Sequence, residues 1–172
     1  MESHDSMKVI DKKDRRFALV IIDVQKIFIV GDDDATLESA AAHTPMMQSV
    51  IERFREAGRP VIWVLYEGET CLKGITDDTY ALLDGFSIAE TDRVIIKHHM
   101  NAFNETDLKD VVKSYDCDAV LLMGMFAQHC VMASYWSAFD NGLSPFMMEG
   151  GLISNKENLC NLAFQLCKTL TS

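Results

Sequence analysis

The sequence has few of the features that mark several classes of protein. Three prolines and nine glycines in 172 residues are too few for a collagen-like or low-complexity chain. Its five cysteines form no Cys-x-x-Cys pair, and the N-terminus has no apolar signal segment, so we expect reduced thiols and a cytoplasmic protein. No apolar run approaches the roughly 20 residues that cross a bilayer, so we expect no contact with a membrane interior.

Basic residues are also scarce, and this limits the partners that we expect. Sixteen basic residues stand against 26 acidic ones, for a formal charge of -10, which argues against binding a nucleic-acid backbone through a broad basic face. Hydrophobic residues make up 48% of the chain, as in ordinary globular domains. A chain of this length buries about 70% of the surface of its unfolded form. We therefore predict one domain over residues 1–172, with the polar residues 1–14 as a loose arm.

Short runs of apolar residues alternate with amphipathic segments along the chain. A short run that is apolar at every position is typical of a parallel strand buried on both faces. Pro145 indicates that the last such run is an edge strand or starts later. The predicted strands cover residues 17–22, 60–66, 93–96, 119–124 and 143–148.

Helical spacing of apolar residues separates these strands. Gly58 is suited to end the first helix, and Asn104 is a candidate cap for the second. Strands and helices in this alternation predict an α/β domain: a three-layer, doubly wound, mostly parallel sheet with helices on both faces. The predicted helices cover residues 36–57, 106–115, 130–139 and 156–170.

Three chemically reactive side chains stand near the carboxyl ends of predicted strands. Asp23 follows the first strand, Lys97 the third, and Cys130 comes shortly after the fourth, where a helix is predicted to begin. Ligands of open parallel sheets bind at this edge. A helix N-terminus and a nearby ammonium both lower a thiol pKa, and a carboxylate can transfer the thiol proton to a leaving amine. The trio therefore predicts nucleophilic thiol chemistry.

Three segments resemble the isochorismatase-like cysteine hydrolases of the nicotinamidase/isochorismatase superfamily. They are Ala-Leu-Val-Ile-Ile-Asp-Val-Gln-Lys-Ile-Phe at 18–28, Val-Ile-Ile-Lys-His-His-Met-Asn-Ala-Phe-Asn-Glu-Thr-Asp-Leu at 94–108, and Val-Leu-Leu-Met-Gly-Met-Phe-Ala-Gln-His-Cys-Val at 120–131. The order of the acid, the amine and the thiol also agrees. The resemblance implies that Cys130 is the nucleophile, Asp23 the general base and acid, and Lys97 the cation beside both.

The same resemblance implies further features of the site. A cis peptide bond is implied at Met125–Phe126, with the N–H groups of Phe126 and Cys130 forming an oxyanion hole for the substrate oxygen. Phe28 is implied as an apolar wall of the pocket. Phe126 stands where the family usually has a small residue, so it narrows the pocket or changes the substrate. A small-molecule substrate and a homo-oligomer are likewise implied.

The sequence departs from the metal-dependent members of this family. Those that hydrolyse nicotinamide carry an Asp/His metal cluster after the second strand, where this chain has Glu67, Glu69 and Cys71 without histidine. We therefore predict no metal site and no cofactor, and interpret these residues as surface loop. Neighbouring residues of an extended segment point in opposite directions, so we assign no catalytic role to His98 or His99. His129 alone makes no Cys–His dyad, and Cys160 and Cys167 are expected in the core.

The function predicted from these features is cleavage of a C–N bond in a small-molecule amide, through a thioester on Cys130. Two alternatives remain open at this stage. One is hydrolysis of a vinyl ether on the same scaffold, which often does not need the thiol. The other is a catalytically idle scaffold or binding protein. Specificity is expected to depend on loops such as residues 67–84.

Overall fold

The computed structural model describes residues 15–29, 34–68 and 77–171, and the arm predicted at residues 1–14 lies outside them. A six-stranded sheet with strand order β3-β2-β1-β4-β5-β6 forms its centre, and every pair of neighbouring strands is parallel. The α/β architecture predicted from the sequence is therefore confirmed. The strands are β1 (Phe17–Ile22), β2 (Val61–Tyr66), β3 (Arg93–Lys97), β4 (Ala119–Met125), β5 (Ser144–Ile153) and β6 (Thr169–Leu170).

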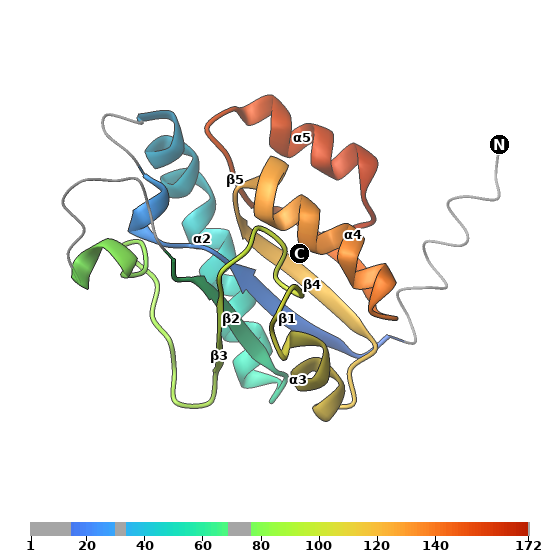
Figure 1. Cartoon of the computed structure of the whole chain (residues 1–172). Helices are drawn as coiled ribbons and strands as arrows, with labels where there is room; N and C mark the ends of the chain where they lie inside the picture. The colour runs from blue at the N-terminus through green and yellow to red at the C-terminus, as the bar shows by residue number, and fades with distance from the viewer. Residues whose placement is uncertain (1–14, 30–33, 69–76, 172) are drawn as a thin grey trace, which may run out of the picture.

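Helices cover both faces of the sheet (Figure 1). One face carries α2 (Asp34–Glu56), and the other carries α3 (Leu108–Ser114), α4 (Met132–Asp140) and α5 (Glu157–Leu166). Two apolar cores result, one on each side of the sheet, as a three-layer fold requires. Within the described ranges, no helix combines the length and apolar character needed to cross a membrane.

Strand β1 shows why the apolar runs form the middle of the sheet. All six of its side chains are buried. Ala18, Val20 and Ile22 belong to the core under α3, α4 and α5, whereas Leu19 and Ile21 belong to the core under α2. A strand covered by helices on both faces needs apolar side chains at every position, and this is what the sequence provides.

The prediction that Pro145 marks an edge strand or a later start is wrong, because β5 already starts at Ser144 and lies between β4 and β6. The Met147 N–H donates to the Lys168 carbonyl on the side of β6, at 2.8 Å. Alternate residues of a strand face the same neighbour, so Pro145 also faces the β6 side. Pairing with β6 starts only at Met147, so the missing N–H of Pro145 breaks no ladder hydrogen bond.

Two predicted helix boundaries also need correction. The C-terminal helix ends at Leu166 rather than residue 170, because Thr169 and Leu170 pair with β5 as strand β6. Asn104 is not the cap of α3, which begins at Leu108 after Asp107. Gly58 does follow α2, with a positive φ of 63° that a residue with a Cβ rarely adopts.

The chain reverses its direction of winding between β1 and β4, which are neighbours in the middle of the sheet. Such a reversal leaves a crevice outside the carboxyl ends of the two strands, and open α/β sheets bind their ligands there. Gly124 allows the two strand ends to approach closely. A Cβ at this position would lie 2.0 Å from the Ile22 carbonyl oxygen, and its φ of 125° is unsuited to other residues.

Candidate active site

The structure brings Asp23, Lys97 and Cys130 together at the carboxyl edge of the sheet. Asp23 directly follows β1, Lys97 is the last residue of β3, and Cys130 lies in the π-helical turn Ala127–Val131 after β4. Lys97 Nζ lies 2.7 Å from Asp23 Oδ2 and 3.6 Å from Cys130 Sγ. One ammonium group therefore contacts both the acid and the thiol. The φ of Asp23 is 55°, a left-handed value uncommon outside glycine that often accompanies functional positions.

Lys97 is fully buried, although lysine is normally a surface residue. Besides its contacts with Asp23 and Cys130, its ammonium group donates hydrogen bonds to the carbonyl oxygens of His99 at 2.9 Å and Met100 at 3.5 Å. It also lies 5.4 Å from the centre of the Tyr66 ring. These contacts replace the water that the ammonium group loses on burial.

The pKa of the Asp23 carboxyl is raised to about 6, because burial disfavours the carboxylate more than the Lys97 ammonium favours it. Besides its ion pair with Lys97, the Asp23 carboxyl interacts with the Cys130 thiol, and both contacts lower its pKa against the effect of burial. The carboxylate is thus placed to accept a proton from this thiol. A carboxylate with a pKa near 6 is ionised at neutral pH yet basic enough to accept a proton.

The pKa of the Cys130 thiol is raised to about 12, which contradicts the lowered value expected from the sequence. Burial is the largest cause, and the negative charge of Asp23 adds to it, while Lys97 opposes both. Helix α4 begins only at Met132, so Cys130 also does not occupy its first position. The resting pair is therefore a protonated thiol beside a carboxylate that can accept its proton.

Two aromatic rings of the segment around Cys130, those of Phe126 and His129, make ring contacts. The peptide bond between Met125 and Phe126 is cis. The ring of Phe126 lies edge-on to Phe28, with centroids 6.3 Å apart, and Phe28 lies 5.7 Å from Tyr66. The rings of His129 and Phe126 are also edge-on to each other, with centroids 6.3 Å apart. Phe28 and Phe126 thus pack against each other near the start of the thiol segment.

Gln25 is a positioning residue that the sequence analysis did not single out, although it stands two residues after Asp23. Its buried amide nitrogen donates to the carbonyl oxygens of Tyr66 at 3.2 Å and Tyr80 at 2.9 Å. Its amide oxygen accepts from the Tyr66 N–H at 2.7 Å. The side chain therefore holds the ends of β1 and β2 and the turn at Asp77–Tyr80 in one arrangement.

Ser134 is a second such residue, fully buried on α4. Its hydroxyl accepts a hydrogen bond from the Ala102 N–H at 2.9 Å and donates one to the Cys130 carbonyl at 2.7 Å. The segment that follows Lys97 is thereby fixed to the segment that carries the thiol. The sequence signal was available, because a serine four residues after a helical residue can bond to its carbonyl.

The remaining candidate residues lie apart from this cluster or outside the described ranges. His98 and His99 are exposed, and the His99 ring contacts Glu105 rather than the thiol. Cys160 and Cys167 are buried in the core. Glu69 and Cys71 lie outside the described residues, whereas Glu67 is exposed. Among residues 15–29, 34–68 and 77–171, no group of three or more His, Cys, Asp or Glu side chains is placed to hold a metal.

Comparison with known protein families assigns this chain to one of them. The sequence profile of the isochorismatase domain matches residues 17–169, which is most of the chain and includes all three clustered residues. The chain belongs to the isochorismatase family. Members of this family are hydrolases.

Individual proteins are similar to this chain either in sequence or in fold. The chain is 28% identical over 133 residues to the secreted isochorismatase effector Isc1 of Verticillium dahliae, which covers 76% of this chain and 69% of that protein. The fold of this chain is similar to that of N-carbamoylsarcosine amidase from Thermoplasma acidophilum, with a TM-score of 0.75 and 23% identity. The match covers 91% of this chain and 95% of that protein. The fold is also similar to that of the nicotinamidase PncA of Bacillus subtilis, with a TM-score of 0.75, 17% identity and coverage of 91% and 100%.

Proposed function

We propose that this isochorismatase-family protein is an amidohydrolase that cleaves a C–N bond of a small molecule through a thioester on Cys130. The observation that carries the proposal is the position of Lys97 Nζ, 2.7 Å from Asp23 and 3.6 Å from the Cys130 sulfur. An acid, a cation and a thiol in contact supply a base, charge stabilisation and a nucleophile. Two proteins of similar fold, an N-carbamoylsarcosine amidase and a nicotinamidase, are named for amide chemistry, which supports the same reaction class.

In the acylation half of the proposed reaction, Cys130 Sγ attacks the amide carbonyl carbon while Asp23 accepts the thiol proton. Negative charge develops on the carbonyl oxygen, and the N–H groups of Phe126 and Cys130 are the proposed donors to it. The C–N bond then breaks, and Asp23 returns the proton to the leaving nitrogen, which departs as ammonia or an amine. A thioester remains on Cys130, and Lys97 holds the carboxyl group and the sulfur in place throughout.

In the second half, water attacks the thioester carbonyl while Asp23 accepts one of its protons. The C–S bond breaks, the carboxylic acid departs, and Asp23 returns its proton to the sulfur, so the thiol is restored. No redox partner or metal is needed for either half. The raised pKa of Cys130 keeps the sulfur protonated until Asp23 and a bound carbonyl act on it together. Phe28 and Phe126 are proposed to contact the apolar part of the substrate.

A screen of small amides tests the proposal, with release of ammonia as the measurement. Primary amides, carbamoyl compounds and a vinyl ether are incubated with the protein at pH 7.5. Ammonia released from at least one amide supports the proposal. Hydrolysis of the vinyl ether alone contradicts it in favour of ether chemistry, and turnover of neither class favours an idle binding protein.

Activity is expected to depend on pH through Asp23. Because the pKa of Asp23 is raised to about 6, the carboxyl is ionised above that pH and protonated below it. Only the ionised form can accept the thiol proton, so kcat/KM on a neutral amide falls about tenfold per pH unit below 6 and is level just above. Steady-state kinetics between pH 4.5 and 8 measure this profile. A profile that is flat down to pH 4.5 contradicts the role of Asp23 as base.

Replacing Ser134 by alanine is expected to impair catalysis through the position of Cys130. The variant leaves the buried Ala102 N–H without its partner and releases the Cys130 carbonyl, at a cost of about 1–3 kcal/mol in the free energy of unfolding. We expect kcat to fall by roughly tenfold or more with the acid limb near pH 6 unchanged, because Asp23 is untouched. Ser137→Ala, a substitution on the same helix that loses the hydrogen bonds from Asn101 and Asn141 to the Ser137 hydroxyl, is the control. Equal activity of the two variants contradicts the prediction.

A further inference from the structure

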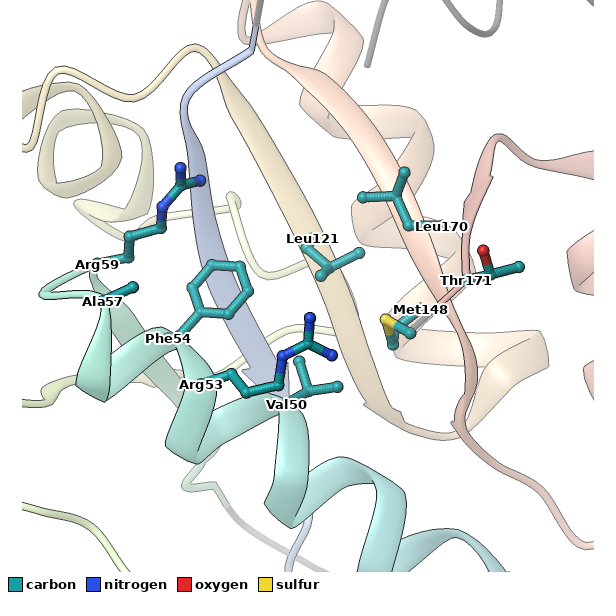
Figure 2. Close-up of a pocket in the computed structure, with 9 residues that line it drawn as sticks. All are labelled: Val50, Arg53, Phe54, Ala57, Arg59, Leu121, Met148, Leu170 and Thr171. Carbon is teal, nitrogen blue, oxygen red and sulfur yellow. The ribbon is translucent and has the colours of Figure 1, made fainter. Parts of the chain in front are cut away.

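A hollow of about 340 Å³ lies on the face of the sheet that α2 covers (Figure 2). A volume of this size falls in the range of sites that hold small organic molecules. Leu121 is the third residue of β4, about 13 Å of strand before its end at Met125. The hollow is therefore separate from the Asp23, Lys97 and Cys130 cluster. Its apolar lining comes from Val50, Phe54 and Ala57 of the α2 side and from Leu121, Met148 and Leu170 of the sheet.

The charged side chains that line this hollow are all basic. Arg53 and Arg59 belong to the lining and no acidic residue does, although acidic residues outnumber basic ones by ten in the whole chain. In Figure 2 the two guanidinium groups lie on either side of the Phe54 ring, and that of Arg53 reaches toward Met148. The hollow thus combines two positive charges with an apolar lining, in a protein whose net charge is negative.

Neither Arg53 nor Arg59 has an ion pair or side-chain hydrogen bond with another described residue. Arg55, two residues along α2 from Arg53, shows the contrast, because it is bound to both Glu52 and Asp92. On α2, Arg55 therefore packs against the fold, whereas Arg53 faces the hollow. A planar guanidinium with free donors matches a carboxylate, which it can bind through two parallel hydrogen bonds.

We propose that this hollow binds a small organic acid with an apolar body, such as a medium-chain carboxylate. The carboxylate pairs with Arg53, and Arg59 adds a second positive charge at the rim. The hydrocarbon part covers Phe54, Leu121 and Met148. The proposal does not depend on the hydrolase reaction, because none of these residues belongs to the proposed catalytic cluster.

Calorimetric titration with sodium octanoate tests this site. Octanoate is expected to bind at least tenfold more tightly than octanamide, which lacks the charge, and than acetate, which lacks the apolar body. Arg53→Gln combined with Arg59→Gln is expected to weaken octanoate binding at least tenfold, since the charge-assisted pair with Arg53 and the second positive charge of Arg59 are both lost. Arg93→Gln, which alters an exposed arginine of β3 away from the hollow, is the control and is expected to bind octanoate as the unaltered chain does.

Octanoate that binds the double variant and the unaltered chain equally well occupies another site, and this result overturns the proposal. Absence of octanoate binding to the unaltered chain overturns it as well. A dimer in sedimentation that the double variant dissociates, without octanoate binding, identifies a second copy of the chain as the occupant instead. The double variant is expected to retain amide hydrolysis, so this proposal and the proposed hydrolase function can each fail alone.

Discussion

Replacing Cys130 by serine is expected to lower kcat/KM for an amide substrate by roughly 10³-fold or more. The sulfur is the atom that forms the proposed thioester, and a hydroxyl in the same place is a far weaker nucleophile beside a carboxyl group with a pKa of about 6. The substitution is small, and Cys130 is only partly buried, so we expect the fold to be unchanged. Steady-state ammonia release and circular dichroism measure the two effects.

Cys117→Ser is the matched control for this substitution. Cys117 is also a free cysteine, buried before β4, and its sulfur contacts the Tyr115 carbonyl rather than Asp23 or Lys97. The control is expected to retain the activity of the unaltered chain. Full activity in Cys130→Ser contradicts thioester chemistry and favours a reaction that uses the same scaffold without the thiol.

Replacing Asp23 by asparagine is expected to lower catalysis while making the thiol more reactive toward iodoacetamide. Catalysis falls by roughly 10³-fold, because the amide of asparagine cannot accept the thiol proton. Alkylation at pH 8 rises, because the charge of Asp23 is one of the causes that raise the pKa of Cys130, and its removal lowers that pKa. Each unit by which the thiol pKa falls increases the thiolate fraction about tenfold.

Lys97→Met is the companion variant, with the opposite expected effect on the thiol. The ammonium group opposes the rise of the Cys130 pKa, so its removal raises that pKa further and slows alkylation. Catalysis falls in this variant too. Mass spectrometry of the peptide that contains Cys130 follows its labelling separately from the other cysteines. Alkylation that changes in the same direction in both variants contradicts the assigned electrostatic roles.

The central strands could be predicted because burial on both faces leaves a simple pattern in the sequence. Every residue of β1 and β4 is buried, and both appear as unbroken apolar runs. Strand β6 has only two residues, Thr169 and Leu170. The helical spacing of apolar residues continues through them in the sequence, but in the structure they pair with β5. A segment this short carries no period from which a strand could be recognised.

The meeting of the acid, the amine and the thiol was also predictable, because parallel strands end at one edge of a sheet. Lys97 lies at the end of β3, two strands from β1, and its long side chain covers that distance. The raised pKa of Cys130 was not predictable, since it depends on burial produced by the whole fold. The roles of Gln25 and Ser134 were missed because their partners are backbone groups from distant segments.

Rapid-quench mass spectrometry of the peptide that contains Cys130 tests the central claim most directly. The protein is mixed with a hydrolysable amide and quenched in acid within the first turnover. The account predicts that this peptide gains the mass of the acyl group, that the adduct disappears as the acid is released, and that Asp23→Asn forms it far more slowly. Turnover of the amide with Cys130 unmodified at every time point, or with the acyl group on another residue, would contradict the account.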